Sequence, residues 1–393
     1  MKKLFLAILF LIGLILHGQD FYPPVLNYSV KDYGTDRNPE NYAVIQDYRG
    51  VMYFGNAHGI LEFDGENWNY ITVRIGEFVR SLAVDKNGTI FAGTFGDFGL
   101  LKANRKGQLE YQSLLNLLPE EDQFFGNIWR IYTIDEYVYF QAQECFYLYN
   151  TKTKAIRTIY PESSYHLSFL VGDQFYLRER GVGLVRFNPA MEIPAPVIGT
   201  DPFKEYGVFG MHHLADDSLL IITQEIGIFK WKNNAIRAIP DKNNRGLNQL
   251  GIFGSLALYD GTYLLTTRTE GAVSMNSNGE ILKQIDRSTG LLSNTIHAAF
   301  QDRDLNVWLA MGNGISKVNY HSPMSYFNEK SGIEGGVSAI KRFKGKLFVG
   351  SAYGLFVQSS NVNKNKRFHN LDVVNGQVWD IKIYNNTLYI ASG

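Results

Sequence analysis

A repeat of about 42 residues is the feature that most constrains the fold of this chain. Its marker is a large apolar residue inside a short run of β-forming residues, with Trp308 as the clearest example. The marker positions are Tyr53, Phe91, Tyr139, Tyr176, Ile221, Leu265, Trp308, Phe348 and Tyr389. From first to last they cover 336 residues in eight steps, or 42 residues per step. This is the length of a four-stranded propeller blade, and the helical period expected of a solenoid is missing.

The residues around the marker indicate antiparallel hairpins. Asp, Asn and Gly precede the marker at residues 47–50, 85–88 and 302–306, and these residue types favour tight turns. A glycine six residues after the marker opens the next run, as at Gly59 and Gly314. Because Asp47, Asp85 and Asp302 recur at one position of the repeat, we interpret them as hairpin caps and not as catalytic carboxylates.

The number of repeats predicts more than one ring. A propeller holds about four to eight blades, whereas this chain has nine repeat starts. We therefore expect an all-β fold: a β-propeller of about seven four-stranded blades over residues 41–335, and the start of a second propeller over 336–393. Eight blades with a frayed tail are the alternative. The ninth repeat stops after its second strand, which predicts a protein that continues beyond residue 393.

The segment before the first repeat is expected to close the ring. Residues 23–28 resemble residues 322–327, which we take to include the outer strand of the seventh blade at 324–327. The segment 19–40 therefore has an outer strand but no first three strands of its own. Supplying that strand to a blade made by the other end of the ring would remove an exposed sheet edge.

The N-terminus is typical of a secretory signal. Lys2 and Lys3 precede an apolar run of 13 residues, and a small residue, Gly18, follows. The run is shorter than the ~20 residues of a membrane span, which favours cleavage after residue 18 over an uncleaved anchor. The single cysteine, Cys145, excludes an internal disulfide and has no accompanying catalytic pattern. Lys and Arg equal Asp and Glu at 38 each, so no net charge favours nucleic acid.

The repeat resembles that of the two-component-regulator propellers. The resemblance rests on Gln301-Asp302 with residues 307–310 and 314–315, and on Gln46-Asp47 with residues 53–55 and 59–65. In that family, propellers form the periplasmic sensor of Bacteroidetes-type one- or two-component regulators. A triple-tyrosine sandwich, a membrane helix and a histidine kinase or helix-turn-helix output follow. The resemblance implies an exported, non-enzymatic sensor segment, tethered to the inner membrane by later sequence. Its expected partners are those downstream domains of the same protein, and a second copy of the chain in a homodimer is the alternative.

Candidate ligand-binding residues lie in the loops of one face. Propeller ligands usually bind over the channel, where second-to-third-strand loops meet the residues that lead into each first strand. The candidates there are His58, Trp129, Arg178, Arg180, Glu225, Arg268, Glu270, His297 and Tyr353, of which Arg178, Arg180, Glu225, Arg268 and Glu270 depart from the repeat's small residues. Arg80, Arg130 and His166 are lead-in residues of the same face. Such a rim would bind a carboxylate, a uronic acid or a peptide end; mutual ion pairs in solvent are the alternative.

Motifs for metals, cofactors and catalysis are missing from the sequence. No paired-cysteine site, H-E-x-x-H, P-loop, dinucleotide fingerprint or Gly-x-Ser-x-Gly elbow occurs, and the adjacent His212 and His213 would face opposite ways on a strand. We predict no cofactor, no metal and no catalytic residue. The second hypothesis is an exported lyase or hydrolase of glycans, with Glu225, Glu270 and His297 as first suspects. The third is a protein-binding scaffold.

Overall fold

The computed structural model describes residues 22–73, 78–242, 246–322, 324, 326, 327, 331–359, 368–374 and 376–393. The chain forms two compact units, one spanning Val25–His321 and the other containing Ser322–Gly393. The predicted signal peptide over residues 1–18 lies outside the described residues. Among the helices that are described, none has the length and apolar character needed to cross a membrane.

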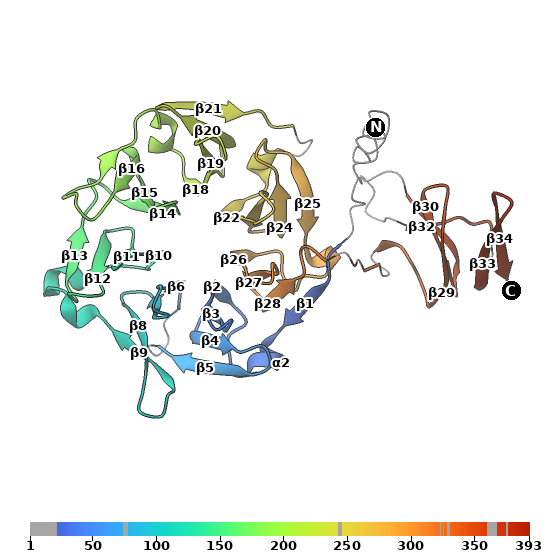
Figure 1. Ribbon diagram of the computed structural model, residues 1–393, viewed down its shortest axis with the longest axis horizontal. Helices are drawn as coiled ribbons and strands as arrows, with labels where there is room; N and C mark the ends of the chain where they lie inside the picture. The colour runs from blue at the N-terminus through green and yellow to red at the C-terminus, as the bar shows by residue number, and fades with distance from the viewer. Residues whose placement is uncertain are drawn as a thin grey trace, which may run out of the picture. The chain divides into compact units, whose positions relative to one another are not determined.

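The larger unit is a ring of seven four-stranded antiparallel sheets, as predicted (Figure 1). The first four blades are β2 (Asn41–Gln46), β3 (Met52–Asn56), β4 (Gly59–Phe63) and β5 (Trp68–Thr72); β6 (Ser81–Val84), β7 (Ile90–Gly93), β8 (Phe98–Ala103) and β9 (Leu109–Ser113); β10 (Arg130–Ile134), β11 (Tyr137–Gln141), β12 (Phe146–Asn150) and β13 (Ile156–Ile159); and β14 (Tyr165–Val171), β15 (Gln174–Glu179), β16 (Gly183–Phe187) and β17 (Ala195–Pro196).

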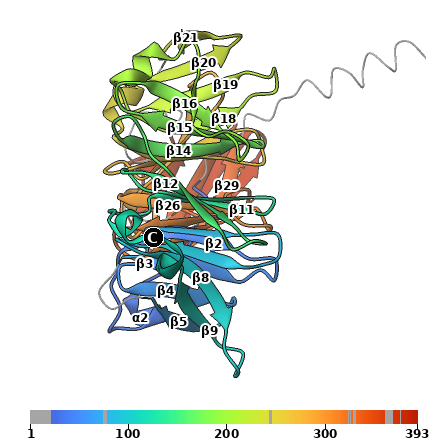
Figure 2. The same cartoon turned by 90° about the vertical axis from the view of Figure 1, so that its left-hand side faces the viewer.

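The remaining three blades complete the ring, which Figure 2 shows edge-on. They are β18 (Val208–His213), β19 (Leu219–Thr223), β20 (Ile228–Lys232) and β21 (Ala235–Ile239); β22 (Ile252–Ala257), β23 (Tyr263–Thr267), β24 (Ala272–Met275) and β25 (Ile281–Ile285); and β26 (Ile296–Gln301), β27 (Val307–Met311), β28 (Ile315–Val318) and β1 (Val25–Tyr28). Short helices lie in the connections: α2 (Val30–Tyr33), η1 (Leu115–Leu117), η2 (Glu120–Gln123), η3 (Asp201–Lys204), η4 (Leu247–Gln249) and η5 (Arg287–Thr289).

The N-terminal strand closes the ring. β1 pairs antiparallel with β28, from Val25 opposite Val318 to Tyr28 opposite Ile315. The Tyr28 ring lies 5.8 Å from that of Trp308 in blade seven and 5.4 Å from that of Trp68 in blade one, so one side chain joins the two blades. Each such aromatic pair adds about 1 kcal/mol beyond the apolar area it buries.

The expected outer strand over residues 324–327 was wrong. Met324, Tyr326 and Phe327 lie in no strand, because β1 occupies the outer position of blade seven. The larger unit therefore ends at His321, earlier than the predicted 335. Eight blades in one ring, the alternative considered, are excluded by the closed set of seven sheets.

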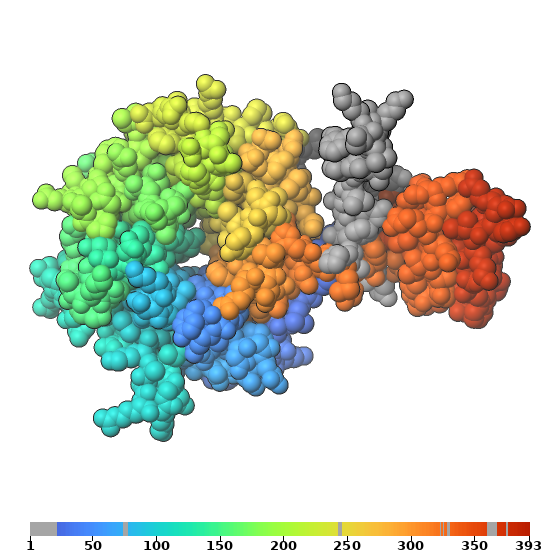
Figure 3. Space-filling model, viewed as in Figure 1, coloured from blue at the N-terminus to red at the C-terminus, as the bar shows by residue number. Residues whose placement is uncertain are grey.

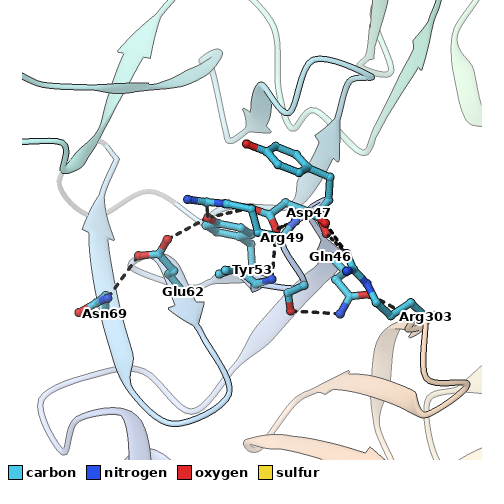
Figure 4. Close-up of polar contacts among 10 residues, drawn as sticks. Gln46, Asp47, Arg49, Tyr53, Glu62, Asn69 and Arg303 are labelled. Atoms are coloured by element: carbon cyan, nitrogen blue, oxygen red, sulfur yellow. Dashed lines mark hydrogen bonds and ion pairs between the residues drawn. The ribbon is translucent and has the colours of Figure 1, made fainter.

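The recurring Gln-Asp pair at the end of the first strand serves the fold twice. Asp47 Oδ1 accepts from the amides of Arg49 and Val51, which caps the hairpin. Gln46 Oε1 accepts from the amide of Arg303 in blade seven, and Arg303 donates to the carbonyl oxygens of Asp47 and Tyr48 (Figure 4). In blade seven, Gln301 Oε1 likewise accepts from the amide of Tyr259 in blade six. Neighbouring blades are thus joined through their hairpins on the same face.

The smaller unit contains the eighth and ninth repeats. The eighth forms a four-stranded sheet of β29 (Val337–Phe343), β30 (Lys346–Ser351), β31 (Gly354–Gln358) and β32 (Phe368–Asn370). The ninth forms a two-stranded sheet of β33 (Val378–Tyr384) and β34 (Thr387–Ser392). Leu355, Val378 and Ile381 form a small core between the two sheets. Packing of one sheet face on the next is the arrangement of successive propeller blades.

Candidate functional site

One face of the ring carries a collar of large side chains around the mouth of its channel. At this face each blade has a buried residue followed directly by a collar residue; the pair opens the first strand in five blades and immediately precedes it in blades two and three. The buried residues are Asn41, Val79, Ile128, Tyr165, Val208, Ile252 and Ile296, none more than 1% exposed. The collar consists of Tyr42, Arg80, Trp129, His166, Phe209, Phe253 and His297. Six of its seven members are aromatic or imidazole side chains.

A β-bulge places these residues. In blade one, Asn41 pairs with Asn56 and Ala43 with Gly55, so Tyr42 has no partner of its own. The same shift leaves Phe209, Phe253 and His297 without a ladder partner in their blades. A bulge turns the unpaired side chain away from the blade-to-blade packing direction. In these four blades the bulge therefore re-aims one residue, whereas Arg80 and Trp129 lie just before the first strands of blades two and three.

The collar side chains contact one another. The ring of His297 lies 4.9 Å from that of Tyr42 and 5.8 Å from that of Phe253. The Arg80 guanidinium lies 4.0 Å above the Tyr42 ring and 5.7 Å from the Trp129 ring. On the other side of the mouth, His166 and Phe209 lie 5.0 Å apart. Cation–π and edge-to-face contacts of this kind hold the rings in fixed positions.

Both collar imidazoles are held in the neutral form. Burial and, to a smaller extent, the positive charges of Arg178 and Arg180 lower the pKa of His166 to about 4. Burial also lowers the pKa of His297; Arg80 and Arg268 add to this effect, whereas Glu40 opposes it. Within the described residues, His166 Nδ1 and His297 Nε2 are buried without a hydrogen-bond partner. A neutral ring nitrogen in this state is suited to a ligand hydroxyl or amide.

Tyr42 connects the collar to a carboxylate. Its hydroxyl donates to Glu40 Oε2 over 2.6 Å, and burial together with this bond raises the Tyr42 pKa to about 12. Glu40 Oε1 lies 3.8 Å from His297 Nε2, which is too long for a hydrogen bond. Arg80 donates its Nε–H to Asn127 Oδ1 over 3.3 Å. The mouth thus combines aromatic faces with a fixed guanidinium and one carboxylate.

The structure brings together only some of the predicted residues. Trp129 and His297 are collar members. The Arg268 guanidinium lies 5.6 Å from the centre of the ring of Phe253, another collar member. His58, Arg180 and Glu225 are exposed loop residues. The Glu270 carboxylate accepts from Gln284 of its own blade. Tyr353 belongs to the smaller unit.

Arg178 serves the fold. It is 3% exposed, and it donates to the carbonyl oxygens of Phe203 and Lys204 over 2.8 Å each, at the end of η3. Its pKa is lowered, chiefly by burial. Tyr42, Phe209 and Phe253 were not identified from the sequence. The signal that would have found them is the residue that follows the buried start of each first strand.

Other potentially reactive side chains, Cys145, His212 and His213, lie outside the collar. Cys145 lies in the core between blades two and three, where burial raises its pKa to about 12. His212 is bonded to Ser255 Oγ over 2.7 Å, and His213 lies toward Asp217 at the surface. In the part of the chain that is described, no three His, Cys, Asp or Glu residues gather in a way that could hold a metal ion.

Solved structures of similar fold include extracellular domains of one- and two-component systems as well as an enzyme. The extracellular domain of the hybrid two-component system BT3049 from Bacteroides thetaiotaomicron is 15% identical with a TM-score of 0.65, over 94% of this chain and 52% of that one. The extracellular domain of the one-component system BT4673 from the same organism is 17% identical with a TM-score of 0.59, over 95% and 51%. This chain thus spans about half the length of those domains.

A third similar structure is an enzyme. Virginiamycin B lyase from Staphylococcus aureus is 17% identical with a TM-score of 0.55, over 76% of this chain and 99% of the lyase. A scan against family models finds no match for the sequence, and a search of the curated proteins finds none either. At these identities the likeness shows the propeller fold, and function has to be argued from the site.

Proposed function

We propose that this chain is the ligand-binding propeller segment of an exported, periplasmic sensor in a transmembrane signalling regulator, without catalytic activity of its own. The collar carries the proposal. The seven blades share one repeat, yet five residue types (Tyr, Arg, Trp, His and Phe) occupy the equivalent position at the mouth, and all of their side chains are large. A residue set that varies while its position is constant is what a binding surface requires.

The chemistry of the collar favours binding over catalysis. The pKa of His166, lowered to about 4, makes it a weak base, and the Tyr42 hydroxyl, whose pKa is raised to about 12, is a weak acid near neutral pH. Flat apolar rings, free ring nitrogens and a guanidinium suit a small molecule, oligosaccharide or peptide with one flat face and several polar groups. The likeness to regulator extracellular domains supports the sensor role. Further sandwich and membrane domains would then pass the bound state onward.

One observation favours an enzyme as the second candidate. Glu40, Tyr42 and His297 meet at the mouth, and a propeller of similar fold is a lyase. A glycan lyase or hydrolase would need this group, or the predicted Glu225 and Glu270, to act on a bound substrate. Glu40→Gln would then abolish turnover of whichever substrate the purified chain cleaves. If Glu40→Gln and Glu225→Gln leave every measured activity unchanged, the hypothesis that these carboxylates catalyse a reaction is wrong.

The sensor proposal is tested by a ligand screen, followed by a comparison of the affinity of each hit for the wild type and for collar variants. The full chain is screened by thermal shift against oligosaccharides, peptides and small carboxylates, and each hit is titrated by calorimetry. Trp129→Leu and Phe253→Leu are expected to weaken a true hit by about tenfold or more, since each removes a stacking face. The control is Tyr259→Leu, an exposed aromatic in a hairpin of the opposite face. Hits that bind all three variants like the wild type would contradict the proposal.

A further inference from the structure

The position that follows the collar residue is small in five of the seven blades, and it carries a charge in only one. The residue after the collar residue is Ala43, Ser81, Gly210, Gly254 or Ala298 in five blades and Leu167 in blade four. In blade three it is Arg130. Arg130 is therefore the only charged residue at this position of the seven blades.

Arg130 reaches across the channel. Its Nη1 donates to the carbonyl oxygen of Trp129 over 3.1 Å, which holds the side chain at the base of the collar. A Cβ added to Gly254 would lie 3.9 Å from Arg130 Nη2. Gly254 lies on β22 of blade six, on the far side of the ring from β10 (Figure 1). The Arg130 side chain therefore extends across the channel below the mouth. The space-filling view shows that the central opening is narrow (Figure 3).

A second polar group faces the same point. Gly254 pairs with Thr266 of β23, and the same added Cβ would lie 3.2 Å from Thr266 Oγ1. Thr266 is 2% exposed, and its hydroxyl has no hydrogen-bond partner within the described residues. A buried hydroxyl without a partner is rare and calls for an occupant that it can bond. Because Gly254 has no side chain, no Cβ of its own occupies the position between this hydroxyl and the guanidinium.

The charge around this point is positive. Arg130 and the nearby Arg178 and Arg180 all act on His166 in the direction that disfavours its protonation. Arg80 and Arg268 act on His297 in the same way. Two carboxylates oppose these charges: Glu40, which is bonded to the Tyr42 hydroxyl, and Glu225, which acts on Arg178. A guanidinium in such surroundings favours an oxyanion, which it binds through two parallel N–H groups.

We propose that the channel below the collar is an oxyanion site, in which Arg130 and Thr266 bind the carboxylate, sulfate or phosphate group of a ligand whose flat part stacks in the collar. This inference rests on the proposed ligand-binding role of the collar and adds the class of ligand: a molecule with one terminal oxyanion that enters the mouth anion first. Gly254 is then a specificity-determining position, because a side chain there would fill the site.

The test compares probes with one ring and different head groups. Benzoate, phenyl phosphate and the neutral benzyl alcohol are titrated into the full chain by calorimetry. We expect at least one anionic probe to bind about tenfold or more tightly than benzyl alcohol. Arg130→Met, which keeps an unbranched but shorter side chain and removes its charge, should abolish that difference, whereas Arg130→Lys should retain part of it. Thr266→Val and Gly254→Ala should weaken the anions alone. Preference between benzoate and phenyl phosphate identifies the head group.

The controls separate this inference from the function on which it rests. Arg105→Met removes the same charge from an exposed hairpin far from the channel and should change nothing. Circular dichroism and thermal unfolding show whether each variant is folded. If benzyl alcohol binds as well as the anions and Phe253→Leu weakens both, the collar binds ligands and the oxyanion site is wrong. If no anionic probe binds, or if a folded Arg130→Met binds the anions like the wild type, the inference is overturned.

Discussion

Trp308 donates its indole N–H to Asp302 Oδ2 over 2.8 Å, within the hairpin that joins the first two strands of blade seven. The other oxygen of the same carboxylate accepts from the amides of Asp304 and Asn306. In blade one Asp47 caps its hairpin in the same way, and Arg49 connects it to Tyr53 at the marker position. The turn aspartate and the marker aromatic are therefore one unit of the repeat, which links the hairpin to the blade core.

Removing this carboxylate should destabilise the ring strongly. Asp302→Ala leaves the Trp308 indole and two hairpin amides without acceptors, each costing about 1 kcal/mol or more. We expect a loss of about 2–4 kcal/mol in the free energy of unfolding, measured by urea titration. Asp304→Ala, an exposed neighbour in the same turn, should cost less than about 0.5 kcal/mol. Equal losses of stability from Asp302→Ala and Asp304→Ala would show that the buried Asp302 carboxylate does not stabilise the ring.

The ring closure can be weakened from the N-terminal strand. Tyr28→Ala removes a half-buried ring that contacts Trp308 and Trp68, which lie in different blades. We expect a loss of about 2–3 kcal/mol, since the cavity lies at the joint between the first and last blades. Leu26→Ala in the same strand is the control, because Leu26 is exposed and should have little effect. Matching losses from both variants would contradict the closing role of Tyr28.

Acid should destabilise the protein through His212. Burial lowers its pKa to about 4 from the ordinary 6.5. Between these values the unfolded chain binds more protons than the folded one, so the contribution of His212 is complete above pH 6.5 and is lost as the pH falls toward 4. Its upper bound is ~3 kcal/mol. His212→Gln keeps a hydrogen-bonding group next to Ser255 and should flatten the pH dependence of the urea midpoint in this window. An unchanged slope would contradict the assignment.

The pKa of His297 should respond to its neighbours in opposite directions. Glu40 raises it and Arg268 lowers it. In an NMR titration of the imidazole, Glu40→Gln should therefore move the His297 pKa further down, and Arg268→Met should move it up. Glu225→Gln, a charge change on an exposed loop of another blade, serves as the control. Shifts of the same sign in the first two variants would mean that His297 does not lie between these charges.

Much of the fold follows from local sequence signals. The marker at Trp308, the turn aspartates and the N-terminal strand were predicted because each depends on residue type and short spacing. The outer strand at 324–327 was predicted wrongly because residues 23–28 carry the same local pattern. Only the long-range pairing of β1 with β28 decides between them, and local propensity does not report such pairing.

The site was predicted in part for a similar reason. Trp129 and His297 stand out as singular residues in the sequence. Tyr42, Phe209 and Phe253 look like ordinary strand residues, and the bulge that turns them to the mouth is a property of register. Arg178 looked available because its acceptors lie in η3, an irregular segment outside the repeat. Arg130 could be placed on the right face, but its reach toward Gly254 depends on the closure of the whole ring.

The most direct test of the account is a crystal structure of the full chain with the tightest ligand from the screen. We expect density for that ligand against the rings of Trp129, Phe253 and His297, with a polar atom within hydrogen-bonding distance of His297 Nε2. Density at another face of the ring, with the collar side chains unchanged and in contact only with water, would contradict the assignment of the collar as the ligand site.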